Sequence, residues 1–248
     1  MSGVLVVTGG SRGIGAAISL LGGKRGYKVC VNYSRAKDRA EAVVRGIKDS
    51  GGEAIAIQAD IAREDDIVRM FREVDKAFGP VTALINNAGM DVPSRDTEDC
   101  RLEDLKTVFA VNVFGTFLCA REAIRRMSTE RGGKGGVIVN IGSRASGHHK
   151  LVGEMPYTAS KGAIDAFTIG LANEVAKKGI RVVCIRPGLI LTEIFEREGL
   201  AAVEERARQN VPLGRIGKPM EIATAALFLC SDEASYIHGT IIDVSGGR

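Results

Sequence analysis

Short runs of β-branched and other apolar residues recur along the chain at intervals too long for hairpins. Seven runs predict strands: Val4–Thr8, Lys28–Tyr33, Glu53–Gln58, Ala83–Asn86, Gly136–Ile141, Ile180–Ile185 and Thr240–Val244. Apolar residues three or four positions apart predict helices over Ala16–Arg25, Lys37–Lys48 and Glu64–Phe78. Strands that alternate with helices in this way predict an α/β fold, a doubly wound and mostly parallel sheet with helices on both faces.

Two later helices are predicted to be longer, over about Leu102–Met127 and about Pro156–Lys177. The first is apolar around most of its circumference, which indicates burial on more than one side and hence a partner subunit. Three stretches have no clear periodicity: Asp91–Asp99, Arg131–Gly135 and Leu189–Lys218. The last is long for a loop inside a compact domain and is interpreted as a lid over a substrate. No linker or repeat divides residues 1–248, so one domain is expected.

Composition narrows the class of protein. Hydrophobic residues are 45% and charged residues 26% of the chain, which is typical of a folded globular protein. The net charge of +4 comes from interspersed signs, aromatic residues are 5% and Trp is absent, so nucleic acid is not an expected partner. No apolar stretch was found to reach the roughly 18–20 residues of a membrane span, and the N-terminus does not resemble a signal peptide.

Thiols and histidines argue against a metal or a disulfide framework. The five cysteines are odd in number and widely spaced, which favours reduced thiols and a cytoplasmic location. His148 and His149 are adjacent, so on an extended loop their side chains point apart, and no carboxylate cluster accompanies them. No metal site is therefore predicted.

A glycine-rich turn follows the first predicted strand and leads into a helix near Ile14. Gly9 permits the sharp turn, Gly13 allows a pyrophosphate to approach the backbone, and Gly15 allows the helix to pack closely on the strand. The helix N-terminus offers free N–H groups and the positive end of a dipole to an anion. The turn residues expected to contact a dinucleotide are Gly9, Ser11, Arg12, Gly13, Ile14 and Gly15.

The spacing of this turn, Thr-Gly-x-x-x-Gly-x-Gly, resembles the short-chain dehydrogenase/reductase family. The resemblance continues in chain order along the whole sequence, through Asn86-Asn87-Ala88-Gly89, Asn112, Ser143, Tyr157-x-x-x-Lys161, Pro187-Gly188 with Thr192, and Val244-Ser245-Gly246-Gly247. It implies a Rossmann-like fold of one domain, a nicotinamide cofactor, a small-molecule carbonyl or alcohol substrate, and a homotetramer.

The end of the second strand indicates which nucleotide is bound. An acidic residue there would hold the adenosine ribose and repel a 2′-phosphate, but this chain has Asn32, which is expected to contact the dinucleotide in its place. Arg12 and Arg35, with Ser34 beside the latter, supply guanidinium groups suited to a phosphate. NADP(H) is therefore predicted over NAD. Asp38 could restore NAD binding if the loop folded back, but it is expected to cap the next helix.

Other cofactor contacts follow from the resemblance. Asp60, with Ile61, corresponds to a position that reaches the adenine, although Asp60 could equally cap the helix that follows. Asn87, Ala88 and Gly89 would contact the nucleotide through their backbone, whereas Asn86 would brace the central strands. Pro187, Gly188, Ile190 and Thr192 would flank the nicotinamide.

Tyr157 and Lys161 lie four residues apart, on one face of a predicted helix. An ammonium group near a phenol favours the phenolate, so Lys161 is expected to lower the pKa of Tyr157 toward the range useful for acid–base catalysis. Ser143 follows a strand and would polarise a carbonyl oxygen; Ser146 is a rival for that role. By resemblance, Tyr157 would also contact the cofactor and Lys161 would hold the nicotinamide ribose. Asn112 would hold a water that links Lys161 to solvent.

These residues predict an NADP(H)-dependent enzyme that interconverts a carbonyl and a secondary alcohol. The chain is similar both to glucose/ribitol-type dehydrogenases, favoured by the glycines at 132–136 and the loop after Ser143, and to 3-oxoacyl-carrier-protein reductases. An acyl-carrier partner would require a basic patch near the site, for which Arg125, Arg126 and Arg131 are candidates. A remote alternative is a dinucleotide sensor without turnover, which would be expected to lack Tyr157 or Lys161.

Overall fold

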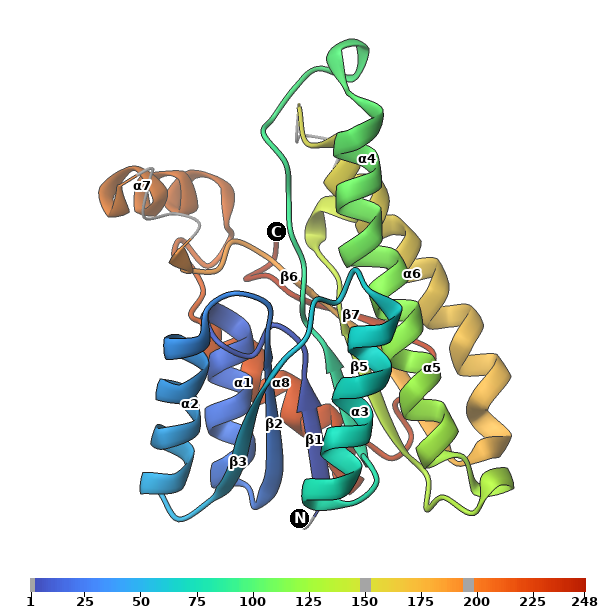
Figure 1. The fold of residues 1–248 in the computed structure, drawn as a ribbon. Coiled ribbons are helices and arrows are strands. Elements are labelled where there is room, and N and C mark those ends of the chain that lie inside the picture. Colours follow the sequence, from blue (N-terminus) through green and yellow to red (C-terminus); the bar gives the residue numbers. More distant parts are fainter. Residues whose placement is uncertain (1–2, 148–152, 194–198) are drawn as a thin grey trace.

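The structure is a computed structural model that describes residues 3–147, 153–193 and 199–248. Its centre is a seven-stranded sheet of order β3-β2-β1-β4-β5-β6-β7, in which every neighbouring pair is parallel (Figure 1). The strands are β1 (Gly3–Val7), β2 (Tyr27–Tyr33), β3 (Glu53–Gln58), β4 (Ala83–Asn86), β5 (Gly136–Ile141), β6 (Ile180–Pro187) and β7 (Ile241–Val244). All seven predicted strands and the doubly wound parallel arrangement are confirmed.

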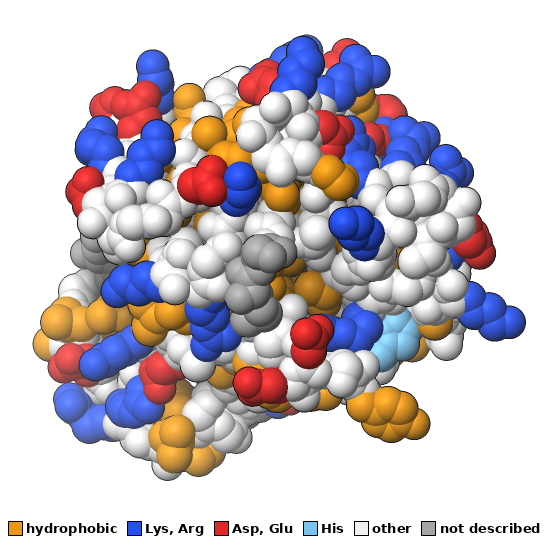
Figure 2. All heavy atoms as spheres, turned by 90° about the horizontal axis from the view of Figure 1, so that it is seen from below, with side chains coloured by type: hydrophobic (Ala, Val, Ile, Leu, Met, Phe, Trp, Pro, Cys, Tyr) orange, Lys and Arg blue, Asp and Glu red, His pale blue; other side chains and the backbone are white. Residues whose placement is uncertain are grey.

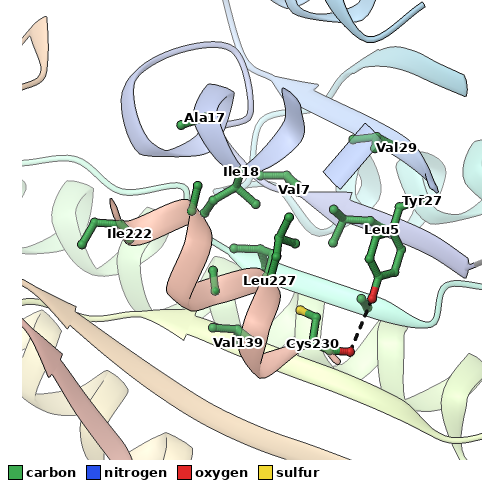
Figure 3. Close-up of a cluster of buried hydrophobic side chains, with 14 of the residues drawn as sticks. Leu5, Val7, Ala17, Ile18, Tyr27, Val29, Val139, Ile222, Leu227 and Cys230 are labelled. Carbon is green, nitrogen blue, oxygen red and sulfur yellow. Dashed lines mark hydrogen bonds between the residues drawn. The ribbon is translucent and has the colours of Figure 1, made fainter. Parts of the chain in front are cut away.

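Helices cover both faces of the sheet, so each inner strand is buried on both sides. One face is covered by α1 (Gly13–Lys24), α2 (Lys37–Asp49) and α8 (Pro219–Leu229), and the other by α3 (Glu64–Phe78), α5 (Thr116–Met127) and α6 (Met155–Val175). Successive residues of β1 alternate between the two cores, with Leu5 in the first and Val6 in the second. Figure 3 shows the first core, where the Tyr27 hydroxyl donates to the Cys230 carbonyl at 3.4 Å.

The predicted long helix is helical over its whole length but is not a regular α-helix. It consists of α4 (Leu102–Phe109), a π-helix η2 (Ala110–Gly115) and α5. Its outer side chains are exposed in the single chain, Phe114 by 58%. This helical rod of α4, η2 and α5 is long and apolar enough to cross a membrane, judged by length and composition alone. The prediction that no apolar stretch reaches such a length is therefore wrong. Half of the most apolar window of the rod is buried inside the protein.

The segment Leu189–Lys218 is not an irregular loop, because it contains α7 (Leu200–Asn210). Val203 and Ala207 on α7 are fully buried and pack with Leu189 and Val211 in a small core of their own. The two ends of the segment are joined by a bridge, since the Gly217 N–H donates to the Leu189 carbonyl at 2.9 Å and the Leu191 N–H donates to the Gly217 carbonyl at 2.8 Å. Within this segment, α7 lies beyond the carboxyl edge of the sheet (Figure 1).

Short helices complete the connections. These are the 3-10 turns η1 (Thr97–Asp99), η3 (Thr129–Arg131), η4 (Arg144–Gly147), η5 (Ala176–Lys178) and η7 (Asp232–Ala234).

On the face of the molecule seen from below, basic and acidic side chains are interspersed with separate hydrophobic ones (Figure 2). This face carries no field of a single sign.

Candidate active site

The glycine-rich turn after β1 is built around backbone that only glycine can supply. Gly9 and Gly13 have φ of +62° and +52°, in the left-handed region. A Cβ on Gly15 would lie 2.2 Å from the Gly9 carbonyl oxygen. α1 begins at Gly13, and no side chain caps its first turn. A glycine-rich turn that leads to an uncapped helix N-terminus fits the pyrophosphate of a dinucleotide.

Asn32 holds this turn from behind rather than facing a ligand. Its side chain is 1% exposed; its Oδ1 accepts from the Gly9 N–H at 3.1 Å, and its Nδ2 donates to the Ala59 carbonyl at 3.1 Å. The predicted contact of Asn32 with a dinucleotide is therefore wrong for the side chain. An amide fits here because it can donate and accept at once, which a carboxylate cannot do.

The neighbouring strand ends are joined by short polar side chains. Thr8, which sequence reasoning missed, accepts from the N–H groups of both Asn87 and Ala88 through Oγ1 at 3.0 Å. The Asn87 Nδ2 donates to the Thr8 and Gly9 carbonyls at 2.9 and 3.1 Å. Asn86 donates to Asn140 on β5 at 2.9 Å, so its predicted role as a brace of the central strands is confirmed. The signal for Thr8 was its position directly before Gly9.

Free guanidinium groups lie at the end of the turn and of β2. Arg12 and Arg35 are exposed and have no ion-pair partner among the described residues, and Ser34 is exposed beside Arg35. The prediction that Asp38 caps the next helix is wrong. The helix α2 begins at Lys37, so Ala36 occupies the cap position. Asp38 lies in the first turn and is exposed, so it makes no capping hydrogen bond.

Asp60 does not cap α3, whose cap position is Arg63. Its Oδ1 accepts from the Ala62 N–H at 3.0 Å, and its own N–H donates to Asp66 at 2.9 Å. The capping alternative is thus wrong, because the two intervening residues form a turn of their own before the helix begins. Ile61 is buried against η2, where a Cβ on Gly115 would lie 2.5 Å from the Ile61 carbonyl oxygen. An adenine contact of Asp60 and Ile61 stays a prediction.

Tyr157 and Lys161 are brought together on α6, as the four-residue spacing predicts. The Lys161 Nζ lies 5.6 Å from the centroid of the Tyr157 ring. Lys161 is 5% exposed, and its Nζ donates to the Ile141 carbonyl at the end of β5 at 2.8 Å. This bond fixes the ammonium group at the carboxyl edge of the sheet, two residues before Ser143.

Ser143 begins a tight turn after β5. Its Oγ accepts from the Ala145 N–H at 3.1 Å, and it is partly exposed. The Ser146 hydroxyl donates to the Ser143 carbonyl at 2.8 Å, so the rival serine is used to hold the turn. Beneath the turn, burial and Asp165 raise the pKa of the Cys184 thiol to about 12, so this thiol is protonated and is not a nucleophile.

Asn112 lies in the π-helix η2, a conformation that is rare and often marks functional sites. Its Oδ1 accepts from the Met90 N–H at 2.9 Å, and its Nδ2 donates to the Met90 carbonyl at 2.9 Å and to the Ser160 hydroxyl at 3.0 Å. A Cβ on Gly89 would lie 3.5 Å from both Asn112 Oδ1 and Lys161 Nζ. Ser160, a second residue that sequence reasoning missed, therefore connects Asn112 to the helix of Tyr157. The water relay through Asn112 stays a prediction.

The segment after β6 reaches the glycine-rich turn through Thr192. Gly188 is required by space, because its Cβ would lie 2.7 Å from the Ser245 Cα. Ile190 is buried in the bridge to Gly217, and the Thr192 methyl lies 3.3 Å from where a Gly13 Cβ would be, over the glycine-rich turn. Pro187, the last residue of β6, is buried.

Ion pairs tie this segment to the body of the protein. Glu193 pairs with Arg39 of α2. At the far end, hydrogen bonds from the Arg215 guanidinium and from the Lys218 N–H lower the pKa of Glu221 to about 2. The contacts of Pro187, Gly188, Ile190 and Thr192 with a nicotinamide stay predictions.

The basic residues proposed for an acyl-carrier partner do not lie at this site. Arg125 and Arg126 are at the C-terminal end of α5, which leads into the start of β5, at the opposite edge of the sheet. Both bind Glu122, and Arg126 also binds Asp75 at 2.8 Å. Arg131 follows in η3 at the same edge. The predicted basic patch near the site is therefore wrong for these residues. His148 and His149 lie outside the described residues.

Comparisons with known proteins give the family. A family profile described as Enoyl-(Acyl carrier protein) reductase matches residues 9–248. The chain is 44% identical over 245 residues to the uncharacterized oxidoreductase YgfF of Escherichia coli, covering 99% of each protein. It is 37% identical over 244 residues to the 3-oxoacyl-[acyl-carrier-protein] reductase FabG of Staphylococcus aureus, covering 98% of this chain and 96% of the relative. The chain belongs to the short-chain dehydrogenase/reductase family.

A solved short-chain dehydrogenase of Burkholderia cenocepacia, in complex with NADP, has the same fold. Its TM-score is 0.89 at 33% sequence identity, with 98% of this chain and 96% of the other covered. The expected family and the Rossmann-like fold are thus confirmed. As a short-chain dehydrogenase/reductase, the protein is an oxidoreductase of a family that binds nicotinamide dinucleotides.

Proposed function

We propose that the protein is an NADP(H)-dependent enzyme that interconverts a carbonyl and a secondary alcohol. The observation that supports this best is the convergence at one sheet edge of the Tyr157 ring, the Lys161 ammonium group held by the Ile141 carbonyl, and the Ser143 turn. Gly13, Gly15 and the uncapped start of α1 would hold the pyrophosphate of the dinucleotide. When bound, NADPH supplies the hydride.

The protein's own groups would supply orientation and a proton. The Ser143 hydroxyl would donate a hydrogen bond to the substrate oxygen and stabilise the negative charge that develops there. The Tyr157 hydroxyl would donate the proton to that oxygen in reduction and accept it in oxidation. Lys161 is buried beside the ring, and its ammonium group would lie near the reacting hydroxyl group. Asn112 would hold the route by which a proton is returned from solvent.

A sugar or polyol is the substrate class that we favour. The alternative is reduction of a 3-oxoacyl group on an acyl carrier protein, the activity named for the Staphylococcus aureus relative. Against it, Arg125 and Arg126 are neutralised by acidic partners and lie at the edge of the sheet away from the site. A sensor without turnover is the remote alternative, and it is not favoured because Tyr157 and Lys161 are both present and adjacent.

The reaction is tested with a panel of sugars and polyols, β-ketoacyl thioesters and an enoyl thioester, each with NADPH or NADP and with NADH or NAD. Absorbance of the reduced nicotinamide reports turnover. Turnover of carbonyl or alcohol compounds with the NADP pair is expected. Reduction of the enoyl thioester alone, or no turnover of any compound despite NADPH binding, would contradict the proposal.

NADPH is expected to bind more tightly than NADH because of Arg35. Replacing Arg35 with Ala should raise the Kd of NADPH about tenfold, since a hydrogen bond to a charged group contributes about 1.5–3 kcal/mol and this one would lie at an exposed position. The Kd of NADH should not change. Lys37→Ala, which removes a nearby exposed cation already paired with Glu41, is the matched control. Equal weakening of both nucleotides by Arg35→Ala would refute the phosphate role.

We propose a homotetramer in the cytoplasm. Exposed apolar side chains extend along the outer side of the α4–η2–α5 rod and onto α6: Leu102, Leu105, Phe114, Phe117 and Ile169. Phe117 stacks on Phe167 of α6 at 3.7 Å between ring centroids, so the two helices form one apolar face. A face of this kind is typical of an interface. The five free cysteines are consistent with a reducing compartment.

The assembly is tested by light scattering after gel filtration. The wild-type protein is expected to have the mass of four chains, and Phe114→Glu to yield a smaller species, because a charge would then be buried in the interface. Phe114→Leu, which keeps the face apolar, should keep the wild-type mass. A monomeric wild-type protein at micromolar concentration would contradict the proposed assembly.

A further inference from the structure

Four charged side chains form a chain of ion pairs beside the candidate site. The Arg144 Nη1 donates to the Asp243 Oδ2 at 2.6 Å. The other oxygen of Asp243 lies 4.0 Å from the Arg186 Nη1. Arg186 in turn donates through Nε and Nη2 to the Asp165 Oδ2, at 3.1 and 2.7 Å. Two positive and two negative charges thus compensate one another.

This chain connects the two elements that carry the candidate catalytic groups. Arg144 directly follows Ser143 and begins η4. Asp165 lies on α6, four residues after Lys161 and eight after Tyr157, so the three side chains share one side of the helix. Arg186 and Asp243 are direct partners in the register of β6 and β7. The path therefore runs from the serine turn across two strands to the helix of Tyr157.

The turn is placed partly by packing, since Ala145 is buried, and by the Gly142 N–H just before it, which donates to the Ile185 carbonyl at 2.7 Å. Among the described residues, the other side-chain hydrogen bonds of residues 143–147 join atoms of the same turn, such as Ser143 Oγ to the Ala145 N–H. These bonds fix its shape but not its position on the sheet. The Arg144–Asp243 pair is the hydrogen bond from this turn that reaches another strand. Gly147 packs against both arginines. A Cβ on Gly147 would lie 3.6 Å from the Arg186 Nη1 and 3.7 Å from the Arg144 Nη1.

The chain of ion pairs is partly buried. The Arg144 and Arg186 side chains are 20% exposed and the Asp165 side chain 10%, whereas the Asp243 side chain is 40% exposed. The Arg144 Nε is buried without a hydrogen-bond partner in the described structure. Ordering an arginine and leaving one of its donors unsatisfied both cost free energy, and an ordinary turn residue would avoid both costs. The cost of this ion pair is explained if the pair holds the serine turn in place.

We propose that Arg144 and Asp243 are positioning residues for Ser143. Their ion pair anchors the serine turn to β7 and, through Arg186 and Asp165, sets the Ser143 hydroxyl in a fixed place relative to Tyr157. The inference rests on the proposed function, in which both hydroxyl groups address one substrate oxygen. It assigns a role in the reaction to the C-terminal strand, which contributes no candidate catalytic group.

Asp243→Asn tests the proposal, because it keeps the shape of the side chain and removes its charge. The kcat for the best carbonyl substrate should fall about 10- to 100-fold, the scale of a misplacement of about 1 Å in a catalytic group. The Kd of NADPH should not change. Arg144→Gln should behave likewise, Arg144→Lys should restore part of kcat, and the double variant should be no worse than either single one. Glu73→Gln, at an exposed ion pair on α3, is the matched control.

Hydrogen exchange followed by mass spectrometry gives a readout that does not depend on turnover. Asp243→Asn should speed exchange of peptides covering residues 142–147 and leave those of α3 unchanged. Wild-type kcat in Asp243→Asn, additive effects in the double variant, or unchanged exchange at 142–147 would each overturn the proposal. If the wild-type protein turns over no compound, the proposed function fails, and the exchange result alone then decides whether the pair anchors the turn.

Discussion

Tyr157→Phe is expected to lower kcat/KM for carbonyl reduction by about 10²–10⁴-fold, the usual contribution of a general acid. The substitution removes only the hydroxyl group, so the ring keeps its place beside the Lys161 Nζ, 5.6 Å from the centroid. The affinity for NADPH should not change by more than a small factor, because the turn that would hold the pyrophosphate follows β1 and contains no residue of α6. Initial rates and direct titration of the nucleotide measure the two effects separately.

Tyr236→Phe is the matched control, since that side chain is fully exposed and belongs to no part of the site. It should have wild-type rates. Wild-type turnover in Tyr157→Phe would refute the assignment of the proton donor. A loss of turnover that accompanies an equal loss of NADPH binding would also refute it, because the tyrosine would then act in binding rather than in proton transfer.

Gly15→Ala is expected to weaken NADPH binding by about 10- to 100-fold. The new Cβ would lie 2.2 Å from the Gly9 carbonyl oxygen and 2.6 Å from the Asn87 Nδ2, so the turn must shift. Overpacking of this kind costs about 1–3 kcal/mol unless the backbone shifts, and a shifted turn would no longer match the pyrophosphate. The fluorescence of NADPH itself reports binding, without a tryptophan background, since the chain has no Trp.

Gly170→Ala is the control for a glycine-to-alanine change, because nothing lies within 4 Å of the added Cβ. It should bind NADPH as the wild-type protein does. Circular dichroism should show that Gly15→Ala retains its helices. Wild-type affinity in Gly15→Ala would mean that the dinucleotide does not lie on this turn.

The strands could be predicted because a strand buried on both faces is a near-continuous apolar run, and β1, β4 and β5 are such runs. Local periodicity could not reveal contacts between distant elements. Gly22 and Gly23 weaken a helix by propensity, yet a Cβ on either would lie 2.5 Å from Leu5 or Ile47. α7 was missed because its buried side, Val203 and Ala207, packs on its own segment and not on the sheet.

The site shows the same division. The spacing of Tyr157 and Lys161 predicts a shared helix face, and the structure brings them together there. The bond from Lys161 to the Ile141 carbonyl spans 20 residues, and no local pattern encodes it. The position of Asn32 at the end of a strand predicts a side chain that faces a ligand. The structure instead buries the amide, where it bonds to the backbone of both Gly9 and Ala59, two residues that are distant in sequence.

The π-helix at Ala110–Gly115 determines which way the side chains of α5 face relative to those of α4. Each residue advances an α-helix by about 100°, and a π turn closes one residue later than an α turn. The offset lets Asn112 face Met90 while Cys119 and Ala123 face the sheet. The number of residues in this segment is thus constrained more tightly than their identity. A deletion of one would turn all of α5 by about a quarter of a revolution, whereas a change of an outward side chain would leave the register of both halves intact.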